Sequence, residues 1–117
     1  MTYLDLNGRV EATQIEQDVY VVSAHGPTDE RVAGELRDVL IPISAADGAT
    51  VVLDLEDAHG LDGETLRVVA DAAHLIRMRG ERMQIVTTSS FTTELVTESG
   101  LGDVVDIVDS LPTEARR

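Results

Sequence analysis

Cysteine, tryptophan and lysine are absent from the 117-residue sequence, and aromatic residues are few. Without cysteine the chain has no disulfides, no thiol catalysis and no cysteine-ligated zinc. The three aromatic residues are Tyr3, Tyr20 and Phe91, in a chain that is 43% hydrophobic overall. We therefore expect a globular fold whose core consists of aliphatic side chains and alanine.

Positive charge is scarce as well. Nine basic residues, all arginine, stand against 22 acidic residues, which gives a formal charge of −13 at pH 7. A field of that sign repels phosphate backbones and anionic lipid headgroups. The composition therefore disfavours nucleic acid and membrane surfaces as partners and favours a protein with a basic face.

Long apolar runs are also missing, since no window of about 18 apolar residues occurs that could span a membrane. The N-terminal residues Met1–Asp5 lack the basic region and the apolar run of a secretion signal. We expect a soluble cytoplasmic protein that forms one domain over residues 1–117, with residues 1–8 as an N-terminal tail or an edge strand. A chain of this length buries about two-thirds of its unfolded surface in one core.

The segment from Val51 to Met78 predicts the centre of the fold. Val51–Leu55 is a near-continuous run of β-branched residues and leucine, typical of a strand buried on both faces of a parallel sheet. An acidic turn, Glu56–Asp62, leads into a predicted helix over Gly63–Met78. Its predicted apolar face consists of Leu66, Val69, Ala70, Ala73 and Ile76. Such a unit places its turn at the carboxyl end of the strand, where α/β sheets usually place binding sites.

The rest of the sequence alternates between predicted strands and helices. Arg9–Ile15 and Val19–Ala24 predict a hairpin around an acidic turn. A helix is expected from Glu30 to Ile41, and Pro42 is expected to end it or to bend its last turn. The remaining predicted elements are a strand over Met83–Thr87, a helix over Phe91–Glu98, a strand over Val104–Val108 and a last helical turn from Asp109 to Ala115.

Three predicted helices are preceded by residues that suit a helix cap. Thr28 or Asp29 precedes the first helix, Asp62 precedes the central one, and Thr88–Ser90 precede the third. Their side-chain oxygens can accept hydrogen bonds from the unpaired amides of the first turn. Gly63 removes a side chain at the centre of this surface, which would let a partner backbone approach closely. Alternatively, Gly60 and Gly63 only satisfy the geometry of the turn.

Four parts of the chain together resemble a known family. They are Gly26–Asp29 followed by Glu35–Arg37, the strand Val51–Leu55, the segment Leu61–Leu66, and Ser99–Asp103 followed by Asp109–Leu111. In this order and spacing they resemble the STAS family, the domain of anti-sigma factor antagonists. The resemblance implies an α/β fold: a STAS-like single domain with a four- to five-stranded mixed β-sheet and helices largely on one face.

The resemblance also implies a partner and a binding surface. Family members typically carry Asp-Ser-Ser-Gly at the start of the central helix, and an anti-sigma factor that is a serine kinase phosphorylates one of the serines. This chain has Asp62-Gly63-Glu64-Thr65 instead, so the usual phosphorylation is not expected. The partner-binding residues that the resemblance implies are Thr28, Asp29, Asp62, Gly63, Glu64 and Thr65.

Glu64 and Thr65 each leave two interpretations open. Glu64 either imitates the phosphorylated form permanently or is simply a favourable acidic residue in the first turn of a helix. Thr65 is either a displaced phosphate acceptor or a residue that supports the helix start.

Other chemistries find less support in the sequence. Asp54, Asp57 and Asp62 faintly resemble the acids of a response-regulator receiver, which also needs a lysine that this chain lacks. Crowded carboxylates disfavour a phosphate cradle at the central helix start. The acidic spacing matches no cation loop and the three histidines stand far apart, so no metal or other cofactor is expected. No triad or acid–base pair can be assembled, so we expect a non-enzyme without catalytic residues.

STAS domains also occur as subunits or appendages of transporters and large signalling assemblies. The alternative interpretation is therefore an accessory or scaffold subunit that requires no phosphorylation. The sequence does not decide whether the protein forms a homodimer.

Overall fold

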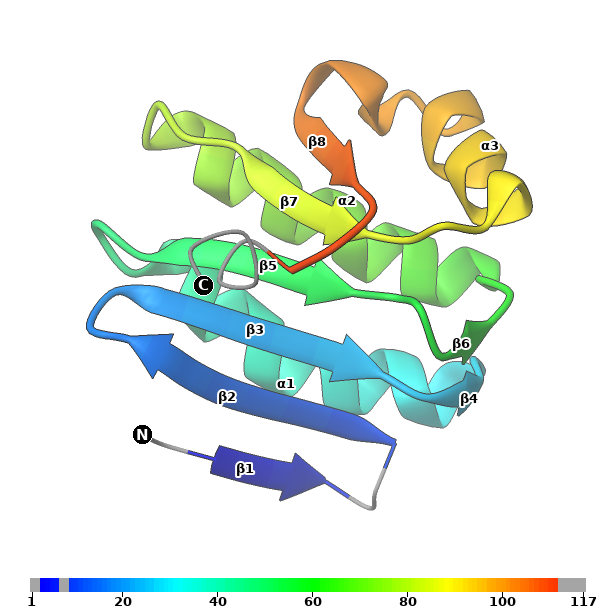
Figure 1. Ribbon diagram of the computed structural model, residues 1–117, viewed down its shortest axis with the longest axis horizontal. Coiled ribbons are helices and arrows are strands. Elements are labelled where there is room, and N and C mark those ends of the chain that lie inside the picture. Colours follow the sequence, from blue (N-terminus) through cyan, green and yellow to red (C-terminus); the bar gives the residue numbers. More distant parts are fainter. Residues whose placement is uncertain (1–2, 7–8, 112–117) are drawn as a thin grey trace.

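The computed structural model describes residues 3–6 and 9–111 and forms a single α/β domain on a six-stranded sheet (Figure 1). In sheet order the strands are β1 (Tyr3–Leu6), β2 (Val10–Glu16), β3 (Val19–Ala24), β5 (Thr50–Asp54), β7 (Met83–Val86) and β8 (Val105–Val108). A separate pair of short strands consists of β4 (Gly26–Pro27) and β6 (Ala58–His59). The helices are α1 (Glu30–Ala45), α2 (Gly63–Met78), α3 (Ser90–Glu98) and the short 3₁₀ helix η1 (Leu101–Asp103).

The sheet is mixed, as the sequence predicts. β1, β2 and β3 are antiparallel neighbours, whereas β3, β5, β7 and β8 run parallel to one another. The predicted hairpin is confirmed as β2 and β3, and the N-terminal segment contributes β1 as an edge strand. This edge strand raises the count to six, one more than the upper end of the predicted range. Because the parallel strands point the same way, β3, β5 and β7 end at one edge of the molecule, on the right in Figure 1.

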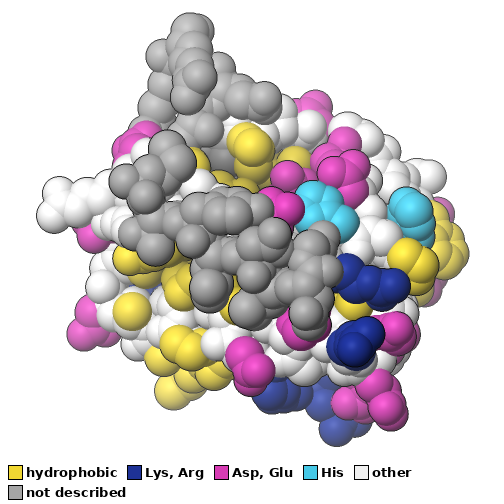
Figure 2. Space-filling model, turned by 90° about the horizontal axis from the view of Figure 1, so that it is seen from below, with side chains coloured by type: hydrophobic (Ala, Val, Ile, Leu, Met, Phe, Trp, Pro, Cys, Tyr) yellow, Lys and Arg dark blue, Asp and Glu magenta, His cyan; other side chains and the backbone are white. Residues whose placement is uncertain are grey.

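Charged side chains lie at the surface. Seen from below, acidic side chains are spread around the molecule and basic side chains gather towards the lower right (Figure 2). The buried polar residues of the described chain are Ser44, Thr65, Thr87 and Thr92, none of them charged. Within residues 3–6 and 9–111, no helix has the length and apolar character needed to cross a membrane.

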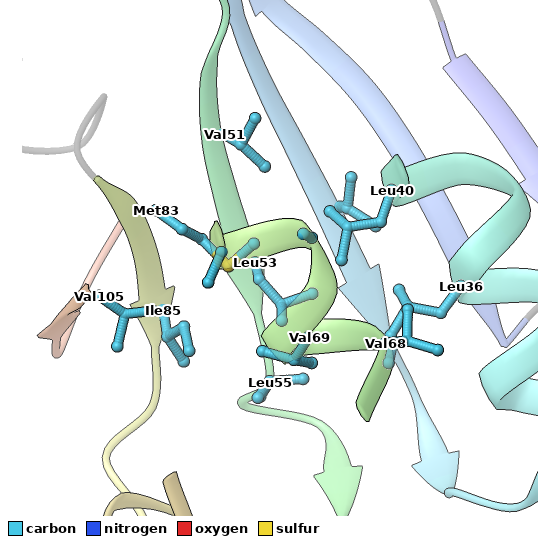
Figure 3. Packing of buried hydrophobic residues seen from close by; sticks show 14 of the residues in the cluster. Leu36, Leu40, Val51, Leu53, Leu55, Val68, Val69, Met83, Ile85 and Val105 are labelled. Atoms are coloured by element: carbon cyan, nitrogen blue, oxygen red, sulfur yellow. The ribbon is translucent and has the colours of Figure 1, made fainter. Parts of the chain in front are cut away.

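Helices α1 and α2 pack against each other over one face of the sheet and bury an aliphatic core (Figures 1 and 3). On the sheet side, Val51, Leu53 and Ile85 are 0% exposed, because alternate residues of each strand point to the face that the helices cover. On the helix side, Leu36 and Leu40 are 0% exposed as well. No aromatic residue is among the buried residues that the structure describes, so the predicted aliphatic core is confirmed.

The buried face of α2 is wider than the predicted one. It consists of Thr65, Val68, Val69, Ala72, Ala73 and Ile76. Leu66 and Ala70, which the sequence pattern places on the apolar face, are only half-buried. α2 packs against both α1 and the sheet, and contact on two sides requires a broader apolar stripe than contact on one.

Helix α1 continues past Pro42 to Ala45, so an end of the helix at this proline is wrong. Proline removes one backbone donor inside a helix, but tertiary contacts retain the last turn. Ser44 is 0% exposed, and its carbonyl accepts a hydrogen bond of 3.1 Å from the Arg79 guanidinium. The last predicted helical turn starts at Asp109, where the chain bends, and residues 112–115 of it lie outside the described residues.

Candidate functional site

Three helices begin at the edge where the parallel strands end (Figure 1). Each is capped by the side chain that precedes it, and the capping residues are Asp29, Asp62 and Ser89. Their oxygens accept main-chain hydrogen bonds from three residues ahead, at 3.0, 3.2 and 3.1 Å respectively. The predicted caps of α1 and α2 are confirmed, and of the two candidates for α1 the cap is Asp29 rather than Thr28.

Thr28 instead joins the starts of α1 and α2. Its hydroxyl donates a hydrogen bond to the Gly60 carbonyl at 3.2 Å and accepts one from the Asp62 amide at 3.1 Å. The short strands β4 and β6 pair in the same region. The loop before α1 and the loop before α2, which lie far apart in the sequence, therefore form one surface. The predicted binding residues of both loops lie together there.

A third loop joins this surface through Glu56. The Glu56 carboxylate accepts hydrogen bonds from both the amide and the hydroxyl of Thr88, with hydroxyl distances of 3.1 and 3.0 Å. Glu56 follows β5 and Thr88 follows β7, so the contact links the ends of two neighbouring strands. Neither residue stands out in the sequence, because no local pattern connects an acid in one loop with a threonine in a distant one.

The predicted binding residues differ in their access to solvent. The exposed ones are Asp29, Gly63 and Glu64, and the half-buried ones are Thr28 and Asp62. Thr65, in contrast, is 0% exposed, and its hydroxyl has no hydrogen-bond partner within the described chain. A partner or a kinase cannot touch this side chain in the observed conformation. The structure therefore argues against Thr65 as a contact or a displaced phosphate acceptor and places it in the core beneath the helix start.

Gly60 and Gly63 differ in the reason for being glycine. Gly60 has φ of 88°, in the left-handed region that favours glycine. Gly63 does not have a positive φ, and a Cβ added to it would meet no heavy atom within 4 Å. The geometry of the turn thus explains Gly60 and leaves Gly63 without an internal reason. The start of α2 is consequently bare and open to an approaching backbone.

Glu64 carries the exposed charge next to this bare position. It lies in the first turn of α2, where the helix dipole favours a carboxylate by about 0.3–1 kcal/mol. Within residues 3–6 and 9–111, no hydrogen bond or ion pair of the Glu64 side chain is found. In contrast to Asp29 and Asp62, which bind the amides of their own helices, Glu64 has its oxygens free for an external donor.

His25 lies between two carboxylates beside the loop that leads to α2. Its Nδ1 lies 3.3 Å from the Asp57 carboxylate, and its Nε2, which has no hydrogen-bond partner within the described chain, lies 3.5 Å from the Glu11 carboxylate. The backbone ties the two loops together, because the Gly26 amide donates a hydrogen bond of 2.8 Å to the Asp57 carbonyl. The structure therefore places His25 between β2 and the β5–β6 loop, a position that the sequence alone does not reveal.

Side-chain hydrogen bonds join three loops at this edge into one surface. Thr28 connects the first loop with the second, and Glu56 connects the second with the third. In the described part of the chain, no group of three histidine, aspartate or glutamate side chains is arranged to hold a metal ion. The surface presents exposed acids and a bare helix start.

Comparisons with known proteins agree with this architecture. The STAS domain model matches residues 10–114. Among solved structures, phosphorylated SpoIIAA from Bacillus has a TM-score of 0.74 and 16% identity, covering 92% of this chain and 96% of that chain. An anti-sigma factor antagonist from Mycobacterium paratuberculosis has a TM-score of 0.73 and 20% identity, covering 97% of each chain. A serine-to-glutamate variant of Moorella thermoacetica RsbS has a TM-score of 0.71 and 19% identity, covering 93% of this chain and 99% of that chain.

A comparison with curated protein sequences found no match. The three solved structures share no more than 20% identity with this chain, so their similarity concerns the fold. The predicted fold is thereby confirmed over almost the whole described chain.

Proposed function

Because the chain belongs to the STAS domain family, we propose that it is an anti-sigma factor antagonist-like regulatory protein that docks on an anti-sigma factor with serine kinase character. Docking would prevent the anti-sigma factor from holding its sigma factor. The protein acts by occupying a surface and catalyses no reaction. The fold that it shares with proteins described as anti-sigma factor antagonists is the general support.

The main support for the proposal is that hydrogen bonds connect the N-terminus of α1 with the N-terminus of α2. Thr28 bridges the two loops through the Gly60 carbonyl and the Asp62 amide. This bridge fixes the residue that directly precedes the exposed pair Gly63 and Glu64. Preorganisation of this kind lowers the entropic cost of association, which favours a protein-docking role.

We further propose that the usual serine phosphorylation does not control this protein. The positions of the two family serines hold Gly63 and Glu64, and neither has a hydroxyl. The nearest hydroxyl in the chain, that of Thr65, is inaccessible. Phosphorylated SpoIIAA and a glutamate-substituted RsbS have folds similar to that of this chain. Such a fold therefore accommodates both a phosphate and an added carboxylate.

The test is a binding and phosphorylation assay with purified proteins. Each anti-sigma factor kinase encoded in the genome that carries this gene is mixed with the chain, and affinity is measured by titration calorimetry. The same mixtures with ATP are then analysed by intact mass. We expect complex formation with one kinase and no mass increase. Phosphate on Thr28 or any other residue would contradict the unswitched state, and binding to a transporter or ATPase subunit instead would favour the scaffold function.

A reversal variant separates the loss of the switch from the loss of the surface. Glu64→Ser restores a hydroxyl in the first turn of α2, so the bound kinase is expected to phosphorylate it if the docking surface persists. Glu98→Ser is the matched control, because Glu98 is an exposed helical glutamate at the far end of α3. Phosphorylation of both variants would indicate non-selective modification and would remove the support for a docking surface at α2.

A further inference from the structure

The start of α3 carries an exposed aromatic side chain on the same edge as the proposed docking surface. Phe91 is 62% exposed and follows the capping residue Ser89 by two positions. The exposed large hydrophobic residues of the described chain are Phe91 and Met78, the latter 83% exposed. Met78 ends α2 at the opposite edge. Phe91 is one of only three aromatic residues in the chain, and most of its large apolar surface makes no contact with the core.

The backbone that presents Phe91 is held in place on both sides. The Glu56 carboxylate accepts hydrogen bonds from the amide and from the hydroxyl of Thr88. The Thr87 hydroxyl accepts a hydrogen bond of 3.1 Å from the Ser89 amide. Ser89 then caps the helix through the Thr92 amide at 3.1 Å. The ring therefore projects from a fixed base and has few rotatable bonds of its own, so little entropy is lost when a partner immobilises it.

The polar surroundings of Phe91 are acidic. Glu94 lies one turn further along α3 and is exposed, which puts it on the same side of the helix as Phe91. Glu56 is exposed in the loop that follows β5, and it bonds to Thr88 in the loop before α3. The sequence of α3 contains no arginine or lysine. An apolar centre with an acidic rim is complementary to an apolar pocket with a basic rim.

We propose that the docking surface extends from α2 to the start of α3, with Phe91 inserted into an apolar pocket of the partner that arginine or lysine side chains surround. The inference rests on the proposed function and deepens it, because it assigns the partner's complementary chemistry. Phe91 supplies affinity as a buried aromatic anchor. Glu94 and Glu56 supply charge that accelerates and orients association.

Calorimetry with the anti-sigma factor kinase that binds the wild-type chain tests the anchor. Phe91→Ser is expected to raise the dissociation constant by about 30-fold or more, because it removes a hot spot of the interface. Met78→Ser removes an even more exposed apolar side chain from the opposite edge and is expected to change affinity less than about twofold. Both variants should unfold at the wild-type temperature, because neither side chain is buried, and Phe91→Leu should recover part of the affinity.

The rim is tested by the rate of association. Glu94→Gln is expected to lower the association rate constant and to weaken its dependence on salt, with a smaller change in the dissociation rate. Glu98→Gln, near the end of the same helix, is the control and should change neither.

The outcomes distinguish this inference from the proposed function. If the wild-type chain binds no anti-sigma factor kinase, the proposed function fails and the inference falls with it. If the wild-type chain binds and Phe91→Ser binds equally well, the inference alone is overturned. If Phe91→Ser leaves the affinity unchanged but dissociates a wild-type dimer in size-exclusion chromatography, the ring is covered by a second copy and the inference is likewise overturned.

Discussion

The two edges of the parallel strands use polar side chains in different ways. At the carboxyl edge, Thr28 and Glu56 bond to neighbouring loops, and Glu64 and Phe91 are left exposed. At the amino edge, arginine side chains bind main-chain carbonyls. Arg79, whose side chain is 10% exposed, donates hydrogen bonds of 3.1 Å to carbonyls at the end of α1 and before β5.

A second arginine strengthens the amino edge. Arg82 donates to the carbonyls of Asp103 and Val105 at 2.8 and 2.9 Å, and its Nε lies 2.9 Å from the Asp106 carboxylate. The guanidinium groups of Arg79 and Arg82 bind main-chain carbonyls next to the α2–β7 connection and at the start of β8. Side chains at the amino edge therefore stabilise the fold, whereas the carboxyl edge is ordered but leaves the Glu64 carboxylate and the Phe91 ring exposed. Substitutions should therefore separate stability from binding according to the edge that they alter.

The largest expected effect is on stability and comes from Arg79→Ala. The variant loses two hydrogen bonds from a charged donor to the carbonyls of two buried residues, Ser44 and Ala49, and we expect the free energy of unfolding to fall by about 3 kcal/mol. Urea denaturation measures the change. The control Arg77→Ala removes an exposed arginine from the same turn and should cost less than about 1 kcal/mol. Equal losses in the two variants would show that Arg79 is not the clamp described.

The next effect in size is expected from Thr28→Val at the carboxyl edge. Valine keeps the shape of threonine but cannot bridge the Gly60 carbonyl and the Asp62 amide, so we expect a loss of about 1–2 kcal/mol in unfolding free energy. Hydrogen exchange of the Asp62 amide should accelerate more than that of amides in β5. Thr97→Val, an exposed change in α3, is the control. An unchanged Asp62 exchange rate would mean that the bridge does not order the α2 start.

A substitution at Gly63 is expected to lower affinity for the partner without lowering the stability of the fold. Gly63→Ala adds a methyl group where no heavy atom lies within 4 Å, so the fold should be unchanged or gain about 0.4–1 kcal/mol. The added methyl group would stand between α2 and a closely approaching partner, and we expect affinity for the partner to drop about tenfold.

The matched control for Gly63→Ala is Gly34→Ala. Gly34 lies in α1 with equally open space around its Cβ position, so it should give a similar gain in stability without a loss of affinity. Comparable affinity losses in both variants would show that Gly63 has no special position in the docking surface.

The smallest expected effect concerns Thr65. Thr65→Val replaces a buried hydroxyl that lacks a partner in the described structure with a methyl group of the same shape, so stability should be unchanged or rise by up to about 1 kcal/mol. Affinity for the partner should stay the same, because the side chain is 0% exposed. Calorimetry and urea denaturation measure both. A clear loss of affinity would show that Thr65 reaches the partner after all and would blur the distinction between surface and core.

The sequence predicted the main elements and candidate caps for all three helices that begin at the carboxyl edge. Val51–Leu55 is a near-continuous apolar run and was predicted as a buried strand. Asp62 was recognised as the cap of the central helix, and Thr28 or Asp29 as the cap of the first, from their positions before amphipathic runs. These predictions succeeded because the strand pattern and the cap each depend on residues only a few positions apart. For the same reason, the end of α1 was misjudged at Pro42, where distant contacts outweigh the local preference of proline.

The sequence by itself determined the aliphatic core, the acidic character and the absence of a serine at the start of α2. Composition and local order decide these properties, so no coordinates are needed to read them. Only the tertiary structure decided that Thr28 reaches Gly60 and Asp62, that Glu56 reaches Thr88, and that Thr65 is buried while Phe91 is exposed. Such contacts join residues that only the folding of the sheet brings within hydrogen-bond range.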